Sequence, residues 1–168
     1  MFPPPTQSKT APKAAPPITQ QRVLAFDFGL RHIGVATAQT ITGTATPLPE
    51  LRARNGEPEW PTLLKLVTEW RPDLLLVGLP LNMDDTDNPI TARARTFATA
   101  LRSRLRAPVS EKSLSEIRVL LVDERLSTRA ANDALAAGRQ HKHHHGMAAC
   151  VIAETWLNDP GFAWPRVD

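Results

Sequence analysis

The sequence predicts an α/β domain in which helices flank a mixed sheet. Short apolar runs alternate with segments of helical spacing in the order βββαβαβαα. Short turns join the first three runs, which favours antiparallel pairing of the first three strands in a five-stranded sheet. The chain has 168 residues, of which 42% are hydrophobic and 22% charged. This composition suits one globular domain and excludes a fibrous or fully disordered protein.

Five apolar segments are expected to form the strands. They are residues 22–28, 33–38, 41–46, 73–78 and 117–122. The first segment ends at Gly29, where a turn is expected. The fourth segment is a continuous apolar run, which is typical of a strand covered on both faces.

Four segments are expected to form helices, and one of them has a cationic face. The segments are residues 61–70, 89–106, 128–137 and 147–157. In the second segment the apolar residues share one face, and the arginines lie on the opposite side and on a flank. The apolar residues are Ile90, Ala94, Phe97, Ala98, Leu101 and Leu105, and the arginines are Arg93, Arg95, Arg102, Arg104 and Arg106. Residues 88–110 contain no acid, so this patch is expected to attract phosphate.

The two ends of the chain are expected to lie outside the folded domain. Residues 1–20 contain six of the sixteen prolines and are predicted to be a flexible tail, followed by one domain at 21–160 and a short tail at 161–168. The start lacks the apolar run of a secretory signal, and no window approaches the ~18 apolar residues of a membrane span. The single cysteine, Cys150, excludes an internal disulfide. We therefore expect a cytoplasmic protein with no membrane partner.

Acidic residues follow several predicted strands. Asp27 lies late in the first strand, in apolar surroundings where a charge is costly unless it is paired or bound to a metal. Asp123 and Glu124 follow the fifth strand, and Asp84 and Asp85 follow the fourth. Such acids can meet at the carboxyl edge of an α/β sheet, where hard divalent cations bind phosphate oxygens and activate water. Considered one at a time, Asp84, Asp85 and Asp123 are explained at least as well as ordinary loop acids as they are as metal ligands.

A histidine cluster precedes the last predicted helix. It consists of His141, His143, His144 and His145. In a helix, the pair at 141 and 145 could chelate zinc, whereas outside a helix the run is a basic loop. We favour the loop. Cys150 is interpreted as a small buried residue of the last helix, because no base is evident beside it in the sequence.

Five motifs follow one another between residues 22 and 158. They are Leu24-Ala-Phe-Asp-Phe-Gly-Leu-Arg-His-Ile-Gly-Val-Ala36, Thr42-Gly-Thr-Ala-Thr-Pro-Leu-Pro49, Val77-Gly-Leu-Pro-Leu-Asn-Met-Asp84, Thr91-Ala-Arg-Ala-Arg95 and Asp123-Glu-Arg-Leu-Ser-Thr128. Together they resemble the YqgF/RuvX family of bacterial proteins. The resemblance implies an RNase H-like fold related to the RuvC Holliday-junction resolvases. It also implies a cytoplasmic nuclease with an associated role in maturing the 5′ end of the 16S ribosomal RNA precursor.

The resemblance also implies a set of functional residues. By motif position, Asp27 is the metal ligand of the first strand, and Glu124, with Asp123 beside it, is the acid of the fifth strand. The implied cofactor is a divalent metal, Mg²⁺ or Mn²⁺. The residues expected to face nucleic-acid phosphates are Arg31, Arg93, Arg95, Arg102 and Arg125.

The sequence departs from the family pattern at one position. The family usually places an aspartate at the start of the last helix, and this chain has His145 there, in His144-His-Gly-Met-Ala-Ala-Cys150. Losing a carboxylate should weaken a magnesium site, whereas imidazole better suits manganese or a softer ion. Three explanations stay open for His145: a metal ligand and catalytic group, a protonated partner of phosphate, or the mark of a weakened enzyme.

Three functions are compatible with these residues. The first is a metal-dependent nuclease acting on structured RNA, with branched DNA as a second candidate substrate. The second is a catalytically weakened nucleic-acid-binding factor of ribosome biogenesis, which the histidine at position 145 motivates. The third is an actin-like phosphotransferase, suggested by the Asp-x-Gly turn at Asp27, but such enzymes need two domains to enclose ATP. The sequence does not determine the oligomeric state.

Overall fold

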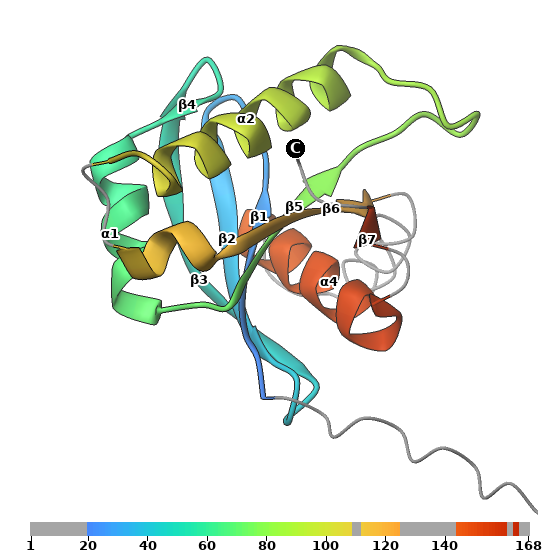
Figure 1. The fold of residues 1–168 in the computed structure, drawn as a ribbon. Coiled ribbons are helices and arrows are strands. Elements are labelled where there is room, and N and C mark those ends of the chain that lie inside the picture. Colours follow the sequence, from blue (N-terminus) through green and yellow to red (C-terminus); the bar gives the residue numbers. More distant parts are fainter. Residues whose placement is uncertain (1–19, 109–111, 125–143, 161–162, 165–168) are drawn as a thin grey trace, which may run out of the picture.

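A computed structural model describes residues 20–108, 112–124, 144–160 and 163–164. These residues form a seven-stranded sheet with helices on both faces (Figure 1). The strands are β1 (Arg22–Asp27), β2 (His32–Gln39), β3 (Thr44–Arg54), β4 (Glu57–Pro58), β5 (Leu74–Leu79), β6 (Arg118–Asp123) and β7 (Ala163–Trp164). The helices are α1 (Trp60–Trp70), α2 (Pro89–Leu105) and α4 (His144–Asn158), with a 3₁₀ helix at Lys112–Glu116.

The sheet is mixed, as predicted. Its order is β4-β3-β2-β1-β5-β6-β7. Strands β1, β2 and β3 pair antiparallel, whereas β5 runs parallel to both β1 and β6. The five predicted strands form the main sheet, and the two-residue strands β4 and β7 extend it at its edges. Because β1, β5 and β6 are parallel neighbours, their carboxyl ends meet at one edge.

The third strand is longer than predicted. The sequence indicated residues 41–46, but β3 spans Thr44–Arg54 and continues through Pro47 and Pro49. Over most of its length β3 pairs only with β2, because β4 pairs with no more than Ala53 and Arg54. Proline lacks a backbone donor, and an edge strand tolerates this on its unpaired side.

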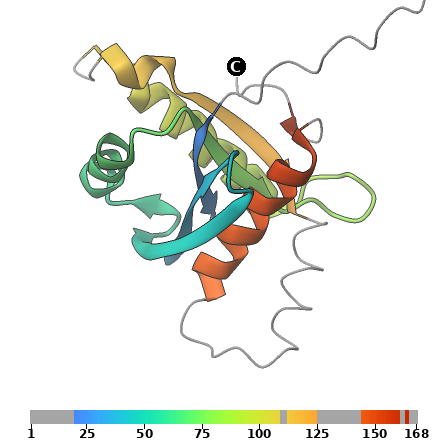
Figure 2. The same cartoon turned by 90° about the horizontal axis from the view of Figure 1, so that it is seen from below.

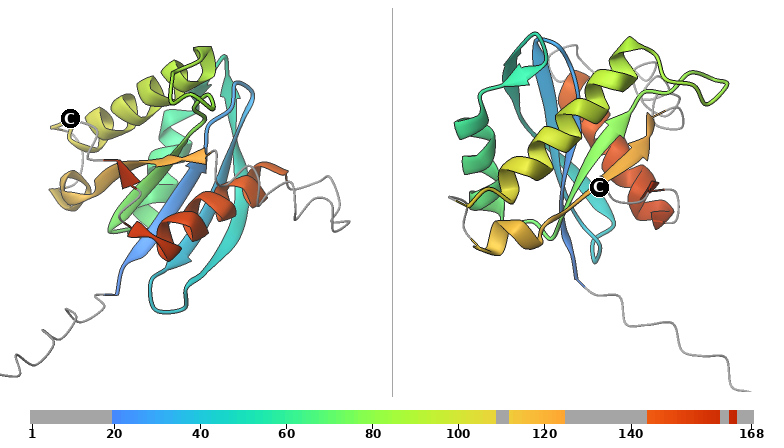
Figure 3. Two further views of the ribbon diagram at one scale, coloured as in Figure 1. Left: turned by 90° about the vertical axis from the view of Figure 1, so that its right-hand side faces the viewer. Right: turned by 45° about the horizontal axis from the view of Figure 1, so that its top comes forward.

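Two layers of helices enclose the sheet. Side chains of β1 alternate between its faces: Leu24 and Phe26 lie in the core formed with α1 and α2, whereas Val23 and Ala25 lie in the core formed with α4. Figures 2 and 3 show the sheet between these layers, with α1 and α2 on one face and α4 on the other. The position of a residue along a strand therefore determines which helices its side chain faces.

Helix α2 follows the sequence prediction except in its first turn. The Asn88 side chain caps it by accepting a hydrogen bond from the Thr91 backbone N–H, and the Thr91 hydroxyl accepts one from the Asn88 backbone N–H. Ile90 was expected on the buried face but is 37% exposed, whereas Thr91 is fully buried. The reason is that the Thr91 hydroxyl donates to the Pro80 carbonyl at 2.5 Å, which turns residue 91 toward the sheet.

Helix α4 begins earlier than predicted. His144 and His145 form its first turn, so the loop interpretation is wrong for these two histidines. The first turn packs directly on Gly34 of β2, and this tertiary contact outweighs the modest helix propensity of histidine and glycine.

Some of the predictions lie outside the described residues. They concern residues 1–19, Arg125, the predicted helix at 128–137, and the histidines at 141 and 143. None of the helices in the described ranges has the length and apolar character needed to cross a bilayer.

Candidate active site

Asp27 and Glu124 lie at the same edge of the sheet, at the carboxyl ends of the parallel strands β1 and β6. Strand β5 lies between them. Asp27 is two positions beyond Ala25 on β1, so its side chain lies on the same face of the sheet, toward α4. Glu124 directly follows β6, and its carboxyl group lies over Gly78 of β5 beside Ile152 of α4. The two carboxyl groups are therefore directed to the same face.

Gly78 in β5 provides the space that Glu124 occupies. A Cβ atom at this position would overlap both Oε1 of Glu124 and Cδ1 of Ile152. Glycine thus lets the carboxyl group lie directly over the middle strand. Sequence reasoning missed this residue, although an isolated glycine in an apolar strand indicates close approach of another group.

The two carboxyl groups are largely buried and hydrogen bonded to each other. Burial raises the pKa of Asp27, while the hydrogen bond from Glu124 and the charge of His145 act in the opposite direction. Burial, the charge and hydrogen bond of Asp27, and the charge of Asp123 raise the pKa of Glu124 to about 9. Glu124 therefore keeps its proton at neutral pH and donates it to Asp27. Two largely buried acids sharing one proton have the oxygen donors and the excess negative potential that favour a hard divalent cation.

His145 joins this pair from the first turn of α4. Its Nδ1 lies 3.5 Å from Oδ2 of Asp27. The His145 side chain is 43% exposed and that of Asp27 is 17% exposed, so the imidazole lies on the solvent side of the carboxylate. A Cβ atom at Gly34 would overlap the His145 carbonyl group, so the glycine permits this close approach of α4 to β2. Three predicted residues, Asp27, Glu124 and His145, are thus brought together.

The other predicted acids lie apart from this group. Asp123 is buried and alternates in phase with Leu121, which packs in the layer of α1 and α2. Strand alternation thus directs Asp123 to the opposite face from the pair. Asp84 and Asp85 lie exposed in the loop after β5, which projects from the sheet in Figures 1 and 3. Asp84 accepts hydrogen bonds from the backbone and hydroxyl of Thr86, as a loop acid commonly does.

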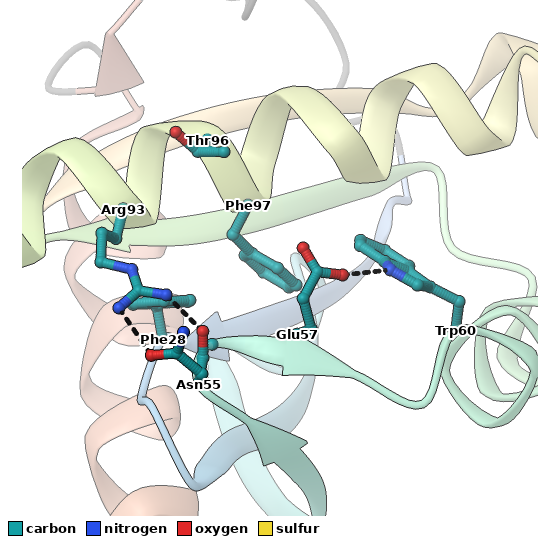
Figure 4. Close-up of a pocket in the computed structure, with 8 residues that line it drawn as sticks. Phe28, Asn55, Glu57, Trp60, Arg93, Thr96 and Phe97 are labelled. Carbon is teal, nitrogen blue, oxygen red and sulfur yellow. Dashed lines mark hydrogen bonds between the residues drawn. The ribbon is translucent and has the colours of Figure 1, made fainter.

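Arg93 links α2 to the turn between β3 and β4. It donates hydrogen bonds to Oδ1 of Asn55, at 3.1 Å, and to the Asn55 carbonyl. Figure 4 shows this pair beside a cavity of about 310 Å³ that Phe28, Phe97 and Trp60 also line. Asn55 is neutral, so these bonds do not themselves neutralise the charge of the guanidinium group.

The other arginines of α2 differ in their partners. Arg95 forms a two-pronged ion pair with Asp87, with N–O distances of 3.0 and 3.2 Å. Arg102 and Arg106 line a hollow of about 510 Å³ near the end of the helix. Arg102 makes no ion pair with any residue in the described ranges. On the cationic face, the charge of Arg95 is therefore neutralised by Asp87, whereas Arg102 is available to bind an anion.

The arginines and the acid pair lie on different faces of the sheet. The N-terminus of α2 lies near the carboxyl edge, because Thr91 bonds to the Pro80 carbonyl just after β5. Arg95 is therefore closer to that edge than Arg102, which is 13 residues beyond Pro89 and about 20 Å along the helix. Arg31 is exposed in the turn between β1 and β2. A nucleic acid touching both regions has to pass around the carboxyl edge.

A second group of possible metal ligands adjoins the acid pair. The group consists of His32, Glu50 and His145. Each of them offers one possible ligand atom, an imidazole nitrogen or a carboxylate oxygen, and these three atoms lie within 4.8 Å of one another. Sequence reasoning missed His32 and Glu50 because they are 18 residues apart and lie on separate strands. Only the pairing of β2 with β3 and the docking of α4 bring them together.

Cys150 is buried, as the sequence indicated. Burial, followed by the charge of Glu154, raises the pKa of this thiol to about 11. The thiol therefore stays protonated at neutral pH, which argues against a nucleophilic role.

Comparison with known sequences identifies one family. A family model described as "RuvX: Holliday junction resolvase" matches residues 21–159. A protein of Glaesserella parasuis named "Putative pre-16S rRNA nuclease" is 45% identical over 142 residues, which are 82% of this chain and 96% of that protein. A protein of Marinobacter nauticus with the same name is 44% identical over 144 residues, which are 83% of this chain and 94% of that protein.

Comparison with solved structures supports the fold. The T. thermophilus RuvC structure in complex with a Holliday junction substrate superposes with a TM-score of 0.53, at 14% sequence identity. The match covers 86% of this chain and 99% of that chain. At this identity the likeness is one of fold, and it confirms the RNase H-like architecture that the sequence resemblance implied.

Proposed function

Because the chain belongs to the RuvX family, we propose that it is a divalent-metal-dependent nuclease that hydrolyses phosphodiester bonds in the precursor of 16S rRNA. The observation that carries the proposal is the largely buried, hydrogen-bonded pair of Asp27 and Glu124 at the carboxyl edge of the sheet, with His145 beside it. The names of the relatives at 44–45% identity support the choice of substrate. Precursor rRNA is a cytoplasmic substrate, and the single cysteine agrees with that compartment.

The acid pair is suited to hold the metal. When Asp27 and Glu124 lose their shared proton, they offer carboxylate oxygens to one side of a cation, as Mg²⁺ and Mn²⁺ prefer. The bound metal supplies Lewis-acid activation of the scissile phosphate and of the attacking water. Gly78 keeps Glu124 over β5 and so sets its position relative to Asp27. Asp123 contributes negative charge from nearby and is not proposed as a direct ligand.

His145 is proposed to act as a third group of this site. Its Nδ1 faces Asp27, and its partly exposed ring can accept or donate a proton at the solvent side of the carboxylate. Compared with a carboxylate at the same place, imidazole favours Mn²⁺ over Mg²⁺. We therefore expect Mn²⁺ to support more activity than Mg²⁺.

The RNA is proposed to lie around the carboxyl edge and along α2. Arg31 and Arg93 keep their positive charge near that edge, and Arg102 extends the cationic surface along the helix. Arg95 contributes less because Asp87 already neutralises it. Arg125 remains a proposed phosphate contact from the sequence pattern alone.

The test is cleavage of end-labelled 16S rRNA precursor by the purified full chain, with Mg²⁺ or Mn²⁺ and with chelator. Wild type, Asp27→Asn, Glu124→Gln and His145→Asp are compared, with Glu69→Gln as a control acid on α1. We expect cleavage by wild type and by Glu69→Gln, and loss of cleavage in Asp27→Asn and Glu124→Gln with unchanged circular dichroism. A Holliday junction in a parallel reaction tests branched DNA as the substrate.

A second candidate function follows from the imidazole at position 145. Without a third carboxylate, the protein could bind precursor RNA and not cleave it. In that case wild type is inactive with either metal, whereas His145→Asp restores metal-dependent cleavage. RNA affinity that survives Asp27→Asn would then identify a binding factor of ribosome biogenesis, and the nuclease proposal would be wrong.

A further inference from the structure

His32, Glu50 and His145 meet on the sheet next to Asp27. His32 opens β2, Glu50 lies in β3 and His145 lies in the first turn of α4. The Nε2 of His32 is 3.8 Å from Oε1 of Glu50, and the two imidazole rings have centroids 5.9 Å apart. Each side chain is 43% exposed, so the group is open to ions from solvent.

Two features of the backbone place these side chains. Ile33 pairs with Leu51 and Val35 with Leu48, so β3 carries one extra residue opposite Gly34, beside Glu50. A bulge of this kind redirects side chains locally. The missing side chain of Gly34 lets the backbone of His145 approach the same point. Strand pairing and helix docking therefore converge on this position.

The possible ligands of this group are two imidazole nitrogens and one carboxylate oxygen, whereas the acid pair offers only carboxylate oxygens. Two imidazoles and one carboxylate are the protein ligands of many zinc sites that keep a fourth position for water. Mg²⁺ prefers oxygen ligands and does not favour this set. Around one tetrahedral zinc ion, ligand atoms about 2.0–2.2 Å from the metal lie roughly 3.5 Å apart. The separations of up to 4.8 Å are larger, and half-exposed side chains can close the difference by small rotations.

Asp27 provides a second, independent feature of a metal-bound histidine. Zinc-ligating histidines usually direct their other ring nitrogen to a carboxylate, which orients the ring and raises its basicity. Nδ1 of His145 faces Oδ2 of Asp27 at 3.5 Å, which leaves Nε2 for an ion. Nδ1 of His145 thus faces Asp27, and Nε2 is left to bind the ion.

We propose that His32, Glu50 and His145 form a zinc site that joins the start of α4 to β2 and β3, beside the acid pair. The site exists whether or not the chain cleaves RNA, so its test does not depend on the nuclease activity. Occupation of the site engages Nε2 of His145, so the ring then acts on the acid pair only through Nδ1 and Asp27. It also fastens the first turn of α4 to the sheet.

The test measures zinc binding by the untagged full chain, after removal of metals, with excess Mg²⁺ present. Competition with a chromogenic zinc indicator gives the affinity, and thermal denaturation gives the stabilisation by zinc. We expect one tight site in wild type, and at least a tenfold weaker site in both His32→Ala and Glu50→Gln, the loss typical of a disrupted metal site. Glu69→Gln should bind as wild type does. Co²⁺ should give the visible spectrum of a tetrahedral site with nitrogen and oxygen ligands.

Two further variants separate this site from its neighbours. Glu124→Gln removes a carboxyl group of the acid pair and should leave the zinc affinity within about twofold, as expected of a residue outside the ligand set. A combined His141→Ala and His143→Ala variant should also keep tight binding. Zinc binding that is unchanged in His32→Ala, or that is lost in either of these further variants, would overturn the proposal.

Discussion

The carboxyl group of Glu124 occupies the space that a side chain at Gly78 would fill. Since Glu124 reaches Asp27 only across this glycine, the middle strand of the parallel part of the sheet controls the geometry of the acid pair. The two acids are 97 positions apart in sequence, and the residue that lets them meet belongs to neither motif.

Gly78→Ala should damage the metal site more than the fold. The added methyl group displaces a flexible carboxyl group and the end of Ile152, and leaves the backbone of β5 in place. We expect the Mn²⁺ affinity to fall at least about tenfold, as when the positioning of a metal ligand is lost. Isothermal titration with Mn²⁺ measures the change.

Gly43→Ala is the matched control for this substitution. Gly43 has a φ of +64° and nothing within 4 Å of its added methyl group. The variant should lose about 1–2 kcal/mol of folding free energy through backbone strain and keep its Mn²⁺ affinity. A normal Mn²⁺ affinity in Gly78→Ala would contradict the assigned role of residue 78.

The metal-free protein should become less stable as the pH rises from about 4.5 to about 9. The folded state raises the pKa of Glu124 from 4.5 to about 9, so it binds a proton that the unfolded chain releases. This contribution is complete below pH 4.5 and is lost as the pH approaches 9, with a slope of at most about 1.4 kcal/mol per pH unit for one proton.

Urea denaturation at several pH values, in chelator, measures this loss. Glu124→Gln removes the titrating group and should flatten the pH dependence. Stability that rises over the same range in the wild type, or a slope that is unchanged in the variant, would disagree with the shared proton.

Arg102 and Arg95 should contribute unequally to RNA affinity. Arg102→Ala removes an available charge and should reduce the salt dependence of binding by about one unit of slope. Arg95→Ala should have a smaller effect, because Asp87 already pairs with this guanidinium group. Asp87→Asn should strengthen RNA binding, because it frees the Arg95 guanidinium group from its ion pair. Fluorescence anisotropy with labelled RNA over a range of salt concentrations gives the slopes, and equal slopes for the two alanine variants would be against this view.

Arg93→Ala should lower the stability of the protein by about 1 kcal/mol, since it removes charged hydrogen bonds between α2 and Asn55. Arg93→Lys keeps the charge but cannot form the same forked contact. It should therefore remain destabilised and still bind RNA as the wild type does. Thermal denaturation and anisotropy on the same samples separate the two effects, and full stability of the lysine variant would argue against a structural role for the fork.

Local patterns in the sequence predicted most elements correctly because those elements depend on neighbouring residues. The apolar run at Leu74–Leu79 and the spacing along Pro89–Leu105 each specify their own secondary structure. The misplaced features depend on contacts between distant segments. Ile90 was expected on the buried face, but Thr91 is buried there instead because its hydroxyl bonds to Pro80. The start of α4 depends on its packing against Gly34.

The sequence by itself determined the family and the mixed sheet, and it singled out Asp27 and Glu124 as candidate site residues, because motifs and periodicity within short segments carry this information. Tertiary structure alone decided that Asp123 turns away from the pair and that Arg95 is neutralised by Asp87. It alone also brought His32 and Glu50 to His145. The physical reason is that strand alternation, sheet register and helix docking set side-chain distances between segments that are remote along the chain.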